Sequence, residues 1–316
     1  MHLQDILSWA AAALSLDSAR FSPSNGLSPS PSLNPSPSPS PSVYSLFTFG
    51  DSYSTTGFNV SLTQPSPDNP MGNPPLGEGT PSDGINWVGY LTTTYNNTLT
   101  LNYNTAVWGA TVDNKIVADV PGDLVYQVTQ VFEPNYCQSD QFGSKPVVRT
   151  AWASDSSLFS LWTGINDVYR LSLRPDPYTL LPRVISRYIE LTERLHACGA
   201  RNFVFFNIPP CNRSPQVRSF DPGFRKNYTE ILREYNQQLQ VAVDEWSVKH
   251  PESAVLMYDA WSFFTEILDH PHSYGFDDST SMGDGKRHIW WDDLHPTSAF
   301  HRLLARDVAG FLGWLE

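Results

Sequence analysis

Short apolar segments alternate with longer segments of helical periodicity along most of this chain. The five apolar segments, each typical of a buried strand, are residues 44–50, 99–107, 157–164, 202–210 and 253–260. Apolar residues recur at helical spacing over 180–197, 226–249 and 298–314. Strands that alternate with helices favour crossover connections, and these place successive strands in parallel. The alternation therefore predicts an α/β fold, a three-layer α/β/α sandwich around a mainly parallel sheet with five strands.

The first 42 residues do not share this pattern. An apolar run over residues 6–16, followed by small residues near Ala19, resembles a signal peptide, and we assign residues 1–20 to it. A disordered or mis-started N-terminus is the alternative. Residues 21–42 consist mostly of Ser and Pro, a composition that predicts an extended linker because it cannot build a core. The folded domain is then expected over residues 43–316.

Charge and composition argue against two classes of partner. The net charge of −12 and the absence of any Lys/Arg cluster disfavour nucleic acid, which would require a basic surface. No apolar run approaches the ~20 residues needed to span a bilayer. Glycosylation is expected at the Asn-X-Ser/Thr triplets of Asn59, Asn96 and Asn227, whereas the triplet at Asn212 is disfavoured by the Pro that follows it. We therefore expect a secreted, extracellular glycoprotein, with a monomer as the favoured state.

Cysteine and histidine usage bears on disulfides and metals. The three cysteines, Cys137, Cys198 and Cys211, allow one disulfide and leave one thiol, and the sequence leaves their pairing open. They form no CxxC pair, so a structural zinc site has little support. His196 falls late in a predicted helix, where we interpret it as a hydrogen-bonded imidazole or one that faces the helix dipole. No metal site is predicted.

Ser52 directly follows the first predicted strand, within a Gly-Asp-Ser turn. A serine hydroxyl needs a base to become nucleophilic, and His295 near the end of the chain is the available candidate. Asp292, three residues before His295, could orient the imidazole and stabilise its charged form. Asp293 is the alternative orienting carboxylate, but adjacent side chains point apart. Asp51, beside Ser52, is interpreted as a structural hydrogen-bond acceptor.

Gly109 and Asn166 follow two further predicted strands. In parallel sheets the ligand site lies at the carboxyl ends of the strands, so these residues should approach Ser52. The N–H groups of Ser52 and Gly109 and the side-chain amide of Asn166 could converge on one oxygen and form an oxyanion hole. Donors placed in this way stabilise the charge that develops when a nucleophile attacks an ester carbonyl.

Four short motifs occur in a fixed order. They are GDSY at 50–53, Gly109 in NTAVWGA, GIND at 164–167 and D-x-x-H at 292–295. In this order they resemble the four blocks of the SGNH (GDSL) hydrolase superfamily, over about residues 44–316. More narrowly, FGDSYSTTGFN, INWVGYL and AVWGATVDN are similar to fungal family 16 carbohydrate esterases, which are acetylesterases. One departure is that Val112 and Asp113 stand where such enzymes often carry a cysteine.

The resemblance implies a flavodoxin-like fold and a residue role for each matched position. Ser52 would be the nucleophile, His295 the base and Asp292 its orienting group, with Gly109 and Asn166 as oxyanion donors. The implied protein is a secreted serine esterase that removes acetyl groups from plant cell-wall oligosaccharides, without a metal or organic cofactor. The alternatives are a lipid or aryl esterase of the same superfamily and, in another class, a non-catalytic glycan-binding module.

Two further features are assigned to substrate binding. Of five tryptophans near these motifs, Trp290 and Trp291 are the preferred candidates to stack on a sugar ring, because they directly precede Asp292. Trp87, Trp108 and Trp162 are the others. The long segment 56–98, rich in Pro, Gly and Asn, is interpreted as a wall or lid of the site.

Overall fold

The computed structural model describes residues 43–118, 120–139 and 150–315. The predicted signal-like segment 1–20 and the Ser/Pro tract 21–42 lie outside the described residues. The strands are β1 (Val43–Gly50), β2 (Leu99–Asn104), β3 (Ser157–Trp162), β4 (Asn202–Phe206) and β5 (Ala254–Tyr258). They form one sheet in the order β2-β1-β3-β4-β5, and every neighbouring pair is parallel. The predicted five-stranded parallel sheet is confirmed.

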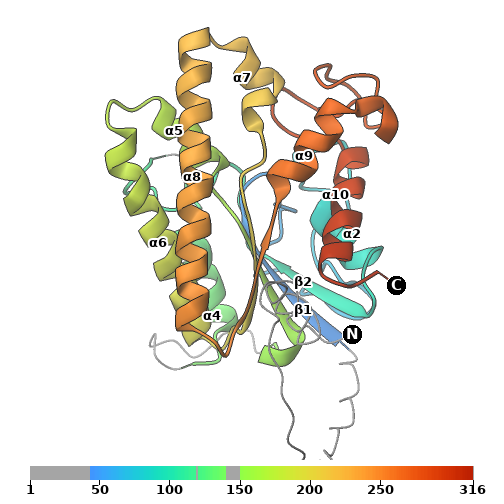
Figure 1. Cartoon of the computed structure of the whole chain (residues 1–316). Helices are drawn as coiled ribbons and strands as arrows, with labels where there is room; N and C mark the ends of the chain where they lie inside the picture. Colours follow the sequence, from blue (N-terminus) through green and yellow to red (C-terminus); the bar gives the residue numbers. More distant parts are fainter. Residues whose placement is uncertain (1–42, 119, 140–149, 316) are drawn as a thin grey trace, which may run out of the picture.

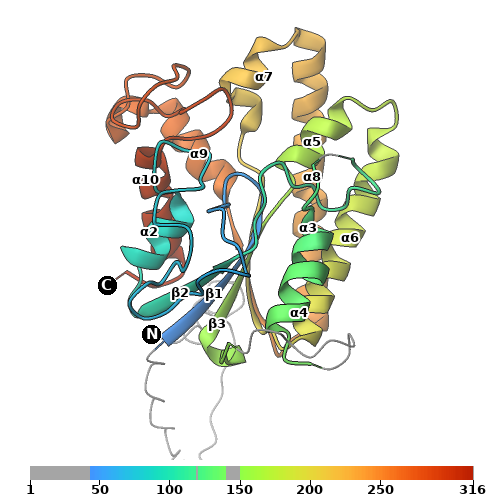
Figure 2. The same ribbon diagram turned by 180° about the vertical axis from the view of Figure 1, so that it is seen from behind.

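Helices cover both faces of this sheet (Figures 1 and 2). They are α2 (Trp87–Thr93), α3 (Leu124–Tyr126), the π-helix η1 (Gln127–Phe132), α4 (Glu133–Tyr136), α5 (Ile165–Ser172), α6 (Pro177–Ala197), α7 (Pro215–Ser219), α8 (Pro222–Lys249), α9 (Ala260–Asp269) and α10 (Ser298–Phe311). Helices α2, α9 and α10 lie on one face, and α3, α4, α6 and α8 lie on the other. None of the described helices is long and apolar enough to cross a membrane. The predicted three-layer α/β/α sandwich is confirmed.

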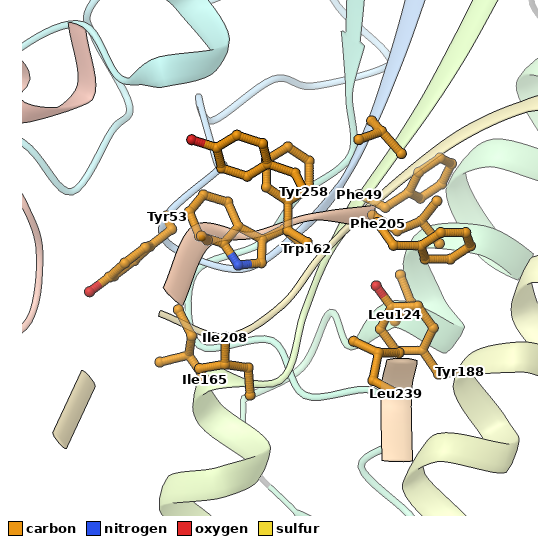
Figure 3. Close-up of a cluster of buried hydrophobic side chains, with 14 of the residues drawn as sticks. Phe49, Tyr53, Leu124, Trp162, Ile165, Tyr188, Phe205, Ile208, Leu239 and Tyr258 are labelled. Atoms are coloured by element: carbon orange, nitrogen blue, oxygen red, sulfur yellow. The ribbon is translucent and has the colours of Figure 1, made fainter. Parts of the chain in front are cut away.

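Aromatic and aliphatic side chains fill the space between the layers (Figure 3). On the face covered by α6 and α8, Phe205 packs against Tyr188 with ring centroids 6.1 Å apart. On the opposite face, Trp162 contacts Tyr53 at 5.6 Å and Phe206 at 4.9 Å. A parallel sheet that is buried on both faces explains why its strands read as continuous apolar runs. Tyr53 belongs to this core and directly follows Ser52 in the sequence, so the core reaches as far as Ser52.

Helices α6 and α8 begin earlier than their apolar periodicity predicts. The prediction for α8 starts at residue 226, but the helix begins at Pro222, because Asp221 accepts hydrogen bonds from the N–H groups of Gly223 and Phe224. Helix α6 likewise begins at Pro177. Proline is favourable in the first turn of a helix, where its missing N–H is not needed. An Asp-Pro start therefore adds a turn that periodicity does not detect.

Strands β2 and β4 end earlier than predicted, at Asn104 and Phe206. The side chain of Asn104 accepts a hydrogen bond from the N–H of Ala106 and donates one to the carbonyl of Ser54. After β4, Pro209 and Pro210 lack the N–H that a sheet requires. Strand β2 therefore ends beside the turn that carries Ser52. Strand β4 continues into a loop at the same edge of the sheet.

Cys137 and Cys198 form a disulfide, and Cys211 is a free, buried thiol. The disulfide joins the residue after α4 to the residue after α6. One turn from the bridge, both guanidinium nitrogens Nε and Nη2 of Arg194 donate to the buried carboxylate of Glu133, at 2.6 and 2.7 Å. The pairing that the sequence left open is therefore decided, and two links hold α4 against α6.

Candidate active site

Ser52 occupies a tight turn at the carboxyl end of β1. The carbonyl of Asp51 accepts hydrogen bonds from the N–H groups of Ser54 and Thr55, at 3.1 and 2.9 Å. The side-chain amide of Gln127 bonds both backbone groups of Gly50, accepting at 2.9 Å and donating at 2.8 Å. Ser52 itself is only 3% exposed. The turn is therefore fixed on both sides of its serine.

His295 is held by Asp292, as the D-x-x-H spacing predicts. Nδ1 of His295 lies 2.7 Å from Oδ2 and 3.0 Å from Oδ1 of Asp292. Oδ1 also accepts the N–H groups of Leu294 and His295 itself. Burial opposes the ionisation of Asp292, but these hydrogen bonds outweigh it and hold the pKa of the carboxyl below its ordinary value. An ionised Asp292 fixes a proton on Nδ1 and leaves Nε2 free to accept another.

Asp293, the alternative orienting residue, does not contact the imidazole in this way. Its backbone carbonyl accepts the N–H of Gln216 at 2.7 Å, which fastens the loop to the start of α7. The geometry therefore favours Asp292. Its carboxylate accepts hydrogen bonds from the backbone of its own turn and also lies at hydrogen-bond distance from the ring of His295.

The fold brings Ser52 and His295 together across 243 residues of sequence. Nε2 of His295 lies 2.9 Å from Oγ of Ser52, a hydrogen-bond distance. The Tyr53 hydroxyl donates to the carbonyl of Leu294 at 2.7 Å, so the serine turn and the histidine loop are joined a second time. The three residues predicted from the sequence thus form a continuous Asp–His–Ser hydrogen-bond chain. This is the arrangement in which a histidine can remove a proton from a serine.

The predicted oxyanion donors lie at the same cavity as Ser52. Gly109 and Asn166 line this cavity together with Ser52 and His295. Gly109 has φ of 77°, and a Cβ there would lie 2.8 Å from Val120, so a side chain at this position is strained. The side-chain amide of Asn166 donates one hydrogen to the carbonyl of Ala110 at 3.0 Å. A primary amide has a second N–H, which Asn166 can offer to a substrate oxygen.

Two buried residues support these positions and were not singled out in the sequence. The carboxylate of Asp167 accepts the N–H of Val112 with both oxygens at 3.1 Å, which fastens the loop of Gly109 to the start of α5. Gln127 clamps Gly50 as described above. Asp167 belongs to the GIND motif, so a signal for it was present. Gln127 lies outside every motif, and only the folded chain reveals its contact.

The cavity has a volume of about 300 Å³. Beyond the residues already named, its lining comprises Trp108, Val120, Ile165, Tyr169, Arg170, Gln216, Tyr228, Asp293 and Leu294. Trp108 is 56% exposed, and its ring meets the imidazole of His295 in a T-shaped arrangement with centroids 5.3 Å apart. Trp108 therefore presents an aromatic surface directly beside the reactive groups.

The expectation that Trp290 contacts the substrate needs correction, and that for Trp291 stays open. Trp290 is 1% exposed, and its indole N–H donates to the carbonyl of Ser279, so it belongs to the core and not to the cavity wall. Trp291 is 43% exposed but is not among the cavity-lining residues, and its binding role stays a prediction. The N–H of Trp291 donates to the carbonyl of His295, so the backbone reverses between these two residues. A tryptophan next to Asp292 in sequence therefore need not lie in the cavity.

The segment 56–98 contributes no residue to the cavity lining, so the interpretation as a wall or lid is wrong for this site. Instead it packs against the start of α10. Asp83 accepts the N–H groups of Gly285 and Ser298, both at 2.6 Å, and the Ser298 hydroxyl donates to the carbonyl of Ile85. The segment therefore supports the loop that carries Asp292 and His295.

The three predicted glycosylation sites differ in their surroundings. Asn59 is exposed, whereas Asn96 and Asn227 are partly buried. The amide of Asn227 donates to the carbonyl of Ser172 from within α8. Modification at these residues stays a prediction.

Comparison with known proteins extends over most of the chain. Residues 46–308 match the family described as GDSL-like lipase/acylhydrolase. The chain is 36% identical over 266 residues to an acetylesterase of Thermothelomyces thermophilus, covering 84% of this chain and 86% of the relative. It is 24% identical to an acetylesterase of Hypocrea jecorina, with 83% and 86% coverage. Among solved structures, the acetylxylan esterase Axe2 of Geobacillus stearothermophilus gives a TM-score of 0.48 at 18% identity, with 86% and 96% coverage.

Proposed function

Because the chain belongs to the GDSL-like lipase/acylhydrolase family and is a hydrolase of ester bonds, we propose that it removes acetyl groups from plant cell-wall oligosaccharides through an acetyl-enzyme on Ser52. The observation that carries this proposal is the 2.9 Å contact between Oγ of Ser52 and Nε2 of His295, backed by Asp292. The acetyl group is supported by the acetylesterase that is 36% identical over most of both chains.

Acylation begins when the Ser52 oxygen attacks the ester carbonyl and its proton passes to Nε2 of His295. Asp292 stabilises the imidazolium through Nδ1. The carbonyl oxygen becomes an oxyanion, and the N–H groups of Ser52 and Gly109 with the amide of Asn166 donate to it. The tetrahedral intermediate then collapses as His295 gives its proton to the departing sugar hydroxyl, which leaves Ser52 acetylated.

Deacylation repeats the same proton transfers with water as the nucleophile. His295 takes a proton from a water molecule, the hydroxide attacks the acetyl carbonyl, and the same donors stabilise the second oxyanion. Collapse returns the proton from His295 to Oγ of Ser52 and releases acetate. The residues that carry these steps, Ser52, His295, Gly109 and Asn166, all line the same cavity.

An oligosaccharide substrate is supported by the exposed ring of Trp108 beside His295. Aromatic rings pack against the apolar faces of sugars, and the remaining lining adds the polar groups of Arg170, Gln216 and Asp293 around them. A surface of this kind suits a sugar better than a long acyl chain, which would require an extended apolar groove.

The decisive experiment treats acetylated xylo-oligosaccharides with purified protein and follows them by mass spectrometry. Loss of acetyl groups, with no loss when Ser52→Ala is used, is the expected result. Initial rates with 4-nitrophenyl acetate and 4-nitrophenyl octanoate test the acyl group. Faster release from the octanoate would contradict the acetylesterase proposal, and unchanged activity of Ser52→Ala would contradict the role of Ser52.

Secretion is part of the proposal. It is supported by the Cys137–Cys198 disulfide, since such bonds persist in oxidising compartments, and by the signal-like run at residues 6–16. N-terminal sequencing of protein recovered from the culture medium tests it, together with the mass change on treatment with an N-glycosidase. Protein that stays inside the cells with an unprocessed N-terminus would contradict secretion.

A further inference from the structure

Two histidines and two glutamates gather at the edge of the sheet opposite Ser52. Glu193 and His196 lie on the last turns of α6, and His250 and Glu252 lie between α8 and β5. These segments lead into the first residues of β4 and β5, whereas Ser52, Gly109 and Asn166 follow the carboxyl ends of their strands. Figure 1 shows α6 and α8 side by side, with their last turns at the same end of the molecule. The cluster is therefore separate from the proposed catalytic centre.

The four side chains are already in contact through atoms that bind metals. Nε2 of His250 lies 2.9 Å from Glu193, and Nε2 of His196 lies 2.8 Å from Glu252. Nδ1 of His250 lies 3.4 Å from the same oxygen of Glu252. One donor atom each from Glu193, His196 and His250 lies within 4.8 Å of the others. Ligand atoms around a tetrahedral zinc ion are about 3.4 Å apart, so small side-chain rotations suffice to close the set around an ion.

Neighbouring groups hold both imidazoles in place. The ring of His250 stacks on Trp246 with centroids 4.3 Å apart, and His196 meets the edge of the same indole at 5.8 Å. Trp246 is only 1% exposed, so both rings pack against a buried side chain. Glu193 and His196 are one helical turn apart on α6 and therefore share a face. Ordered ligands lose little conformational entropy when they bind an ion.

Access and charge also suit a divalent cation. The histidine side chains are 16% and 18% exposed, and the carboxylates of Glu193 and Glu252 are 46% and 50% exposed. A surface groove of about 270 Å³ between α6 and α8 includes Glu193 and Trp246 and gives a route to the cluster. The carboxylates of Glu193 and Glu252 bring negative charge to the cluster, and the guanidinium of Arg201 is engaged by the backbone carbonyl of His196 at 2.8 Å.

We propose that Glu193, His196 and His250 bind a divalent transition-metal ion of the Zn²⁺ type, with Glu252 as the second carboxylate that contacts both histidine rings. Nitrogen and oxygen ligands of this kind suit zinc and its neighbours in the series better than Ca²⁺ or Mg²⁺. The ion would link the end of α6 to the segment before β5. Its role is to stabilise the fold and not to take part in ester hydrolysis.

The test uses full-length protein that has been treated with a chelator and dialysed. Isothermal titration with ZnCl₂ should show one site, and Zn²⁺ should raise the melting temperature while the same concentration of Mg²⁺ does not. Glu193→Gln and His250→Gln should each weaken zinc binding by more than about 10-fold, because each removes a ligand. His270→Gln, which changes an exposed histidine of the α9 C-terminus, is the matched control and should bind as the wild type does.

The rate with 4-nitrophenyl acetate separates this site from the catalytic centre. We expect the same rate for Glu193→Gln and wild type after chelation. Circular dichroism establishes that each variant is folded. Wild-type protein that binds no Zn²⁺ at micromolar concentration, or variants that keep full affinity, would overturn the proposal. Loss of esterase activity on removal of zinc would overturn the structural role.

Discussion

The chemistry proposed for Ser52 depends on a few side chains that hydrogen bonds hold in place. Asp292 bonds the ring of His295 and two backbone N–H groups with one carboxylate. The amide of Asn166 is fixed by Ala110. Such groups reach the transition state without reorganisation, and this is the main source of electrostatic catalysis.

The first prediction concerns the oxyanion donors. Asn166→Ala should lower kcat for 4-nitrophenyl acetate by about 10²- to 10³-fold with little change in KM, because the amide acts on charge that appears only in the transition state. Steady-state kinetics measure both constants. Asn97→Ala, at an exposed asparagine, is the control. An unchanged kcat for Asn166→Ala would remove this residue from the proposed mechanism.

Asp51 gives a prediction about stability and pH. Burial raises the pKa of its carboxyl from 3.8 to about 7, and its Oδ2 atom has no hydrogen-bond partner among the described residues. A carboxyl that is harder to ionise in the folded state than in the unfolded chain adds to the free energy of unfolding. This contribution is fully present at pH values below the unfolded pKa. That contribution is lost as pH rises towards about 7. The loss amounts to as much as about 4 kcal/mol.

Asp51→Asn removes the ionisable group and keeps an oxygen that can accept the N–H of Tyr53. Urea unfolding at pH 4, 6 and 8 should therefore show the free energy of unfolding of the variant rising relative to the wild type as pH increases. Parallel pH profiles for the two proteins would show that Asp51 ionises normally in the folded state.

At the scale of elements, the junctions between strands and helices create the site. Ser52 follows β1 and Asn166 opens α5 just after β3, and β1 and β3 are hydrogen-bonded neighbours. Gly164 makes the second junction possible: its φ is 137°, and a Cβ there would lie 2.4 Å from the ring of Tyr235. In parallel sheets all such junctions meet at one edge.

Helices α4 and α6 provide the element-scale prediction. The Cys137–Cys198 disulfide closes a loop of 61 residues, and its loss should lower the free energy of unfolding by about 4 kcal/mol because the unfolded chain gains freedom. Chemical denaturation of the double variant Cys137→Ser/Cys198→Ser measures this. Reductant should destabilise the wild type by a similar amount and leave the variant unchanged. Equal stability of the variant and the oxidised wild type would contradict the expectation.

At the scale of the whole molecule, the two ends of the folded domain complete one site. The first half supplies Ser52, Gly109 and Asn166, and the last part supplies Asp292 and His295. Two sets of hydrogen bonds between other residues also join these two parts of the chain. One is the bond from the Tyr53 hydroxyl to Leu294, and the other is the pair that Asp83 accepts from Gly285 and Ser298.

Asp83 tests this coupling. Asp83→Ala should lower kcat for 4-nitrophenyl acetate by about 10-fold, because a displacement of His295 by a fraction of an ångström weakens proton transfer. Asp83→Asn keeps an acceptor oxygen and should retain much of the activity. Asp68→Ala, at an exposed aspartate of the same segment, should behave as the wild type. Wild-type kcat in Asp83→Ala would show that the 56–98 segment does not support the base.

The sequence alone predicted the five strands and the three helices α6, α8 and α10, and with the family resemblance it named the five residues proposed for catalysis. Periodicity is a local property, and Ser52, Gly109, Asn166, Asp292 and His295 lie in short motifs whose spacing follows from strand ends and one turn. The Asp-Pro pairs that precede helices α6 and α8, at Asp176 and Asp221, are also visible in the sequence. Apolar periodicity alone did not identify them as helix starts.

Only the tertiary structure decided which distant groups meet. It paired Cys137 with Cys198, buried Trp290 while leaving Trp108 beside His295, and directed the 56–98 segment to α10 instead of the cavity. It also joined Glu193 and His196 to His250, which no spacing along the chain indicated. The physical reason is that such contacts depend on how helices pack on the two faces of the sheet, and packing sums weak interactions over the whole domain.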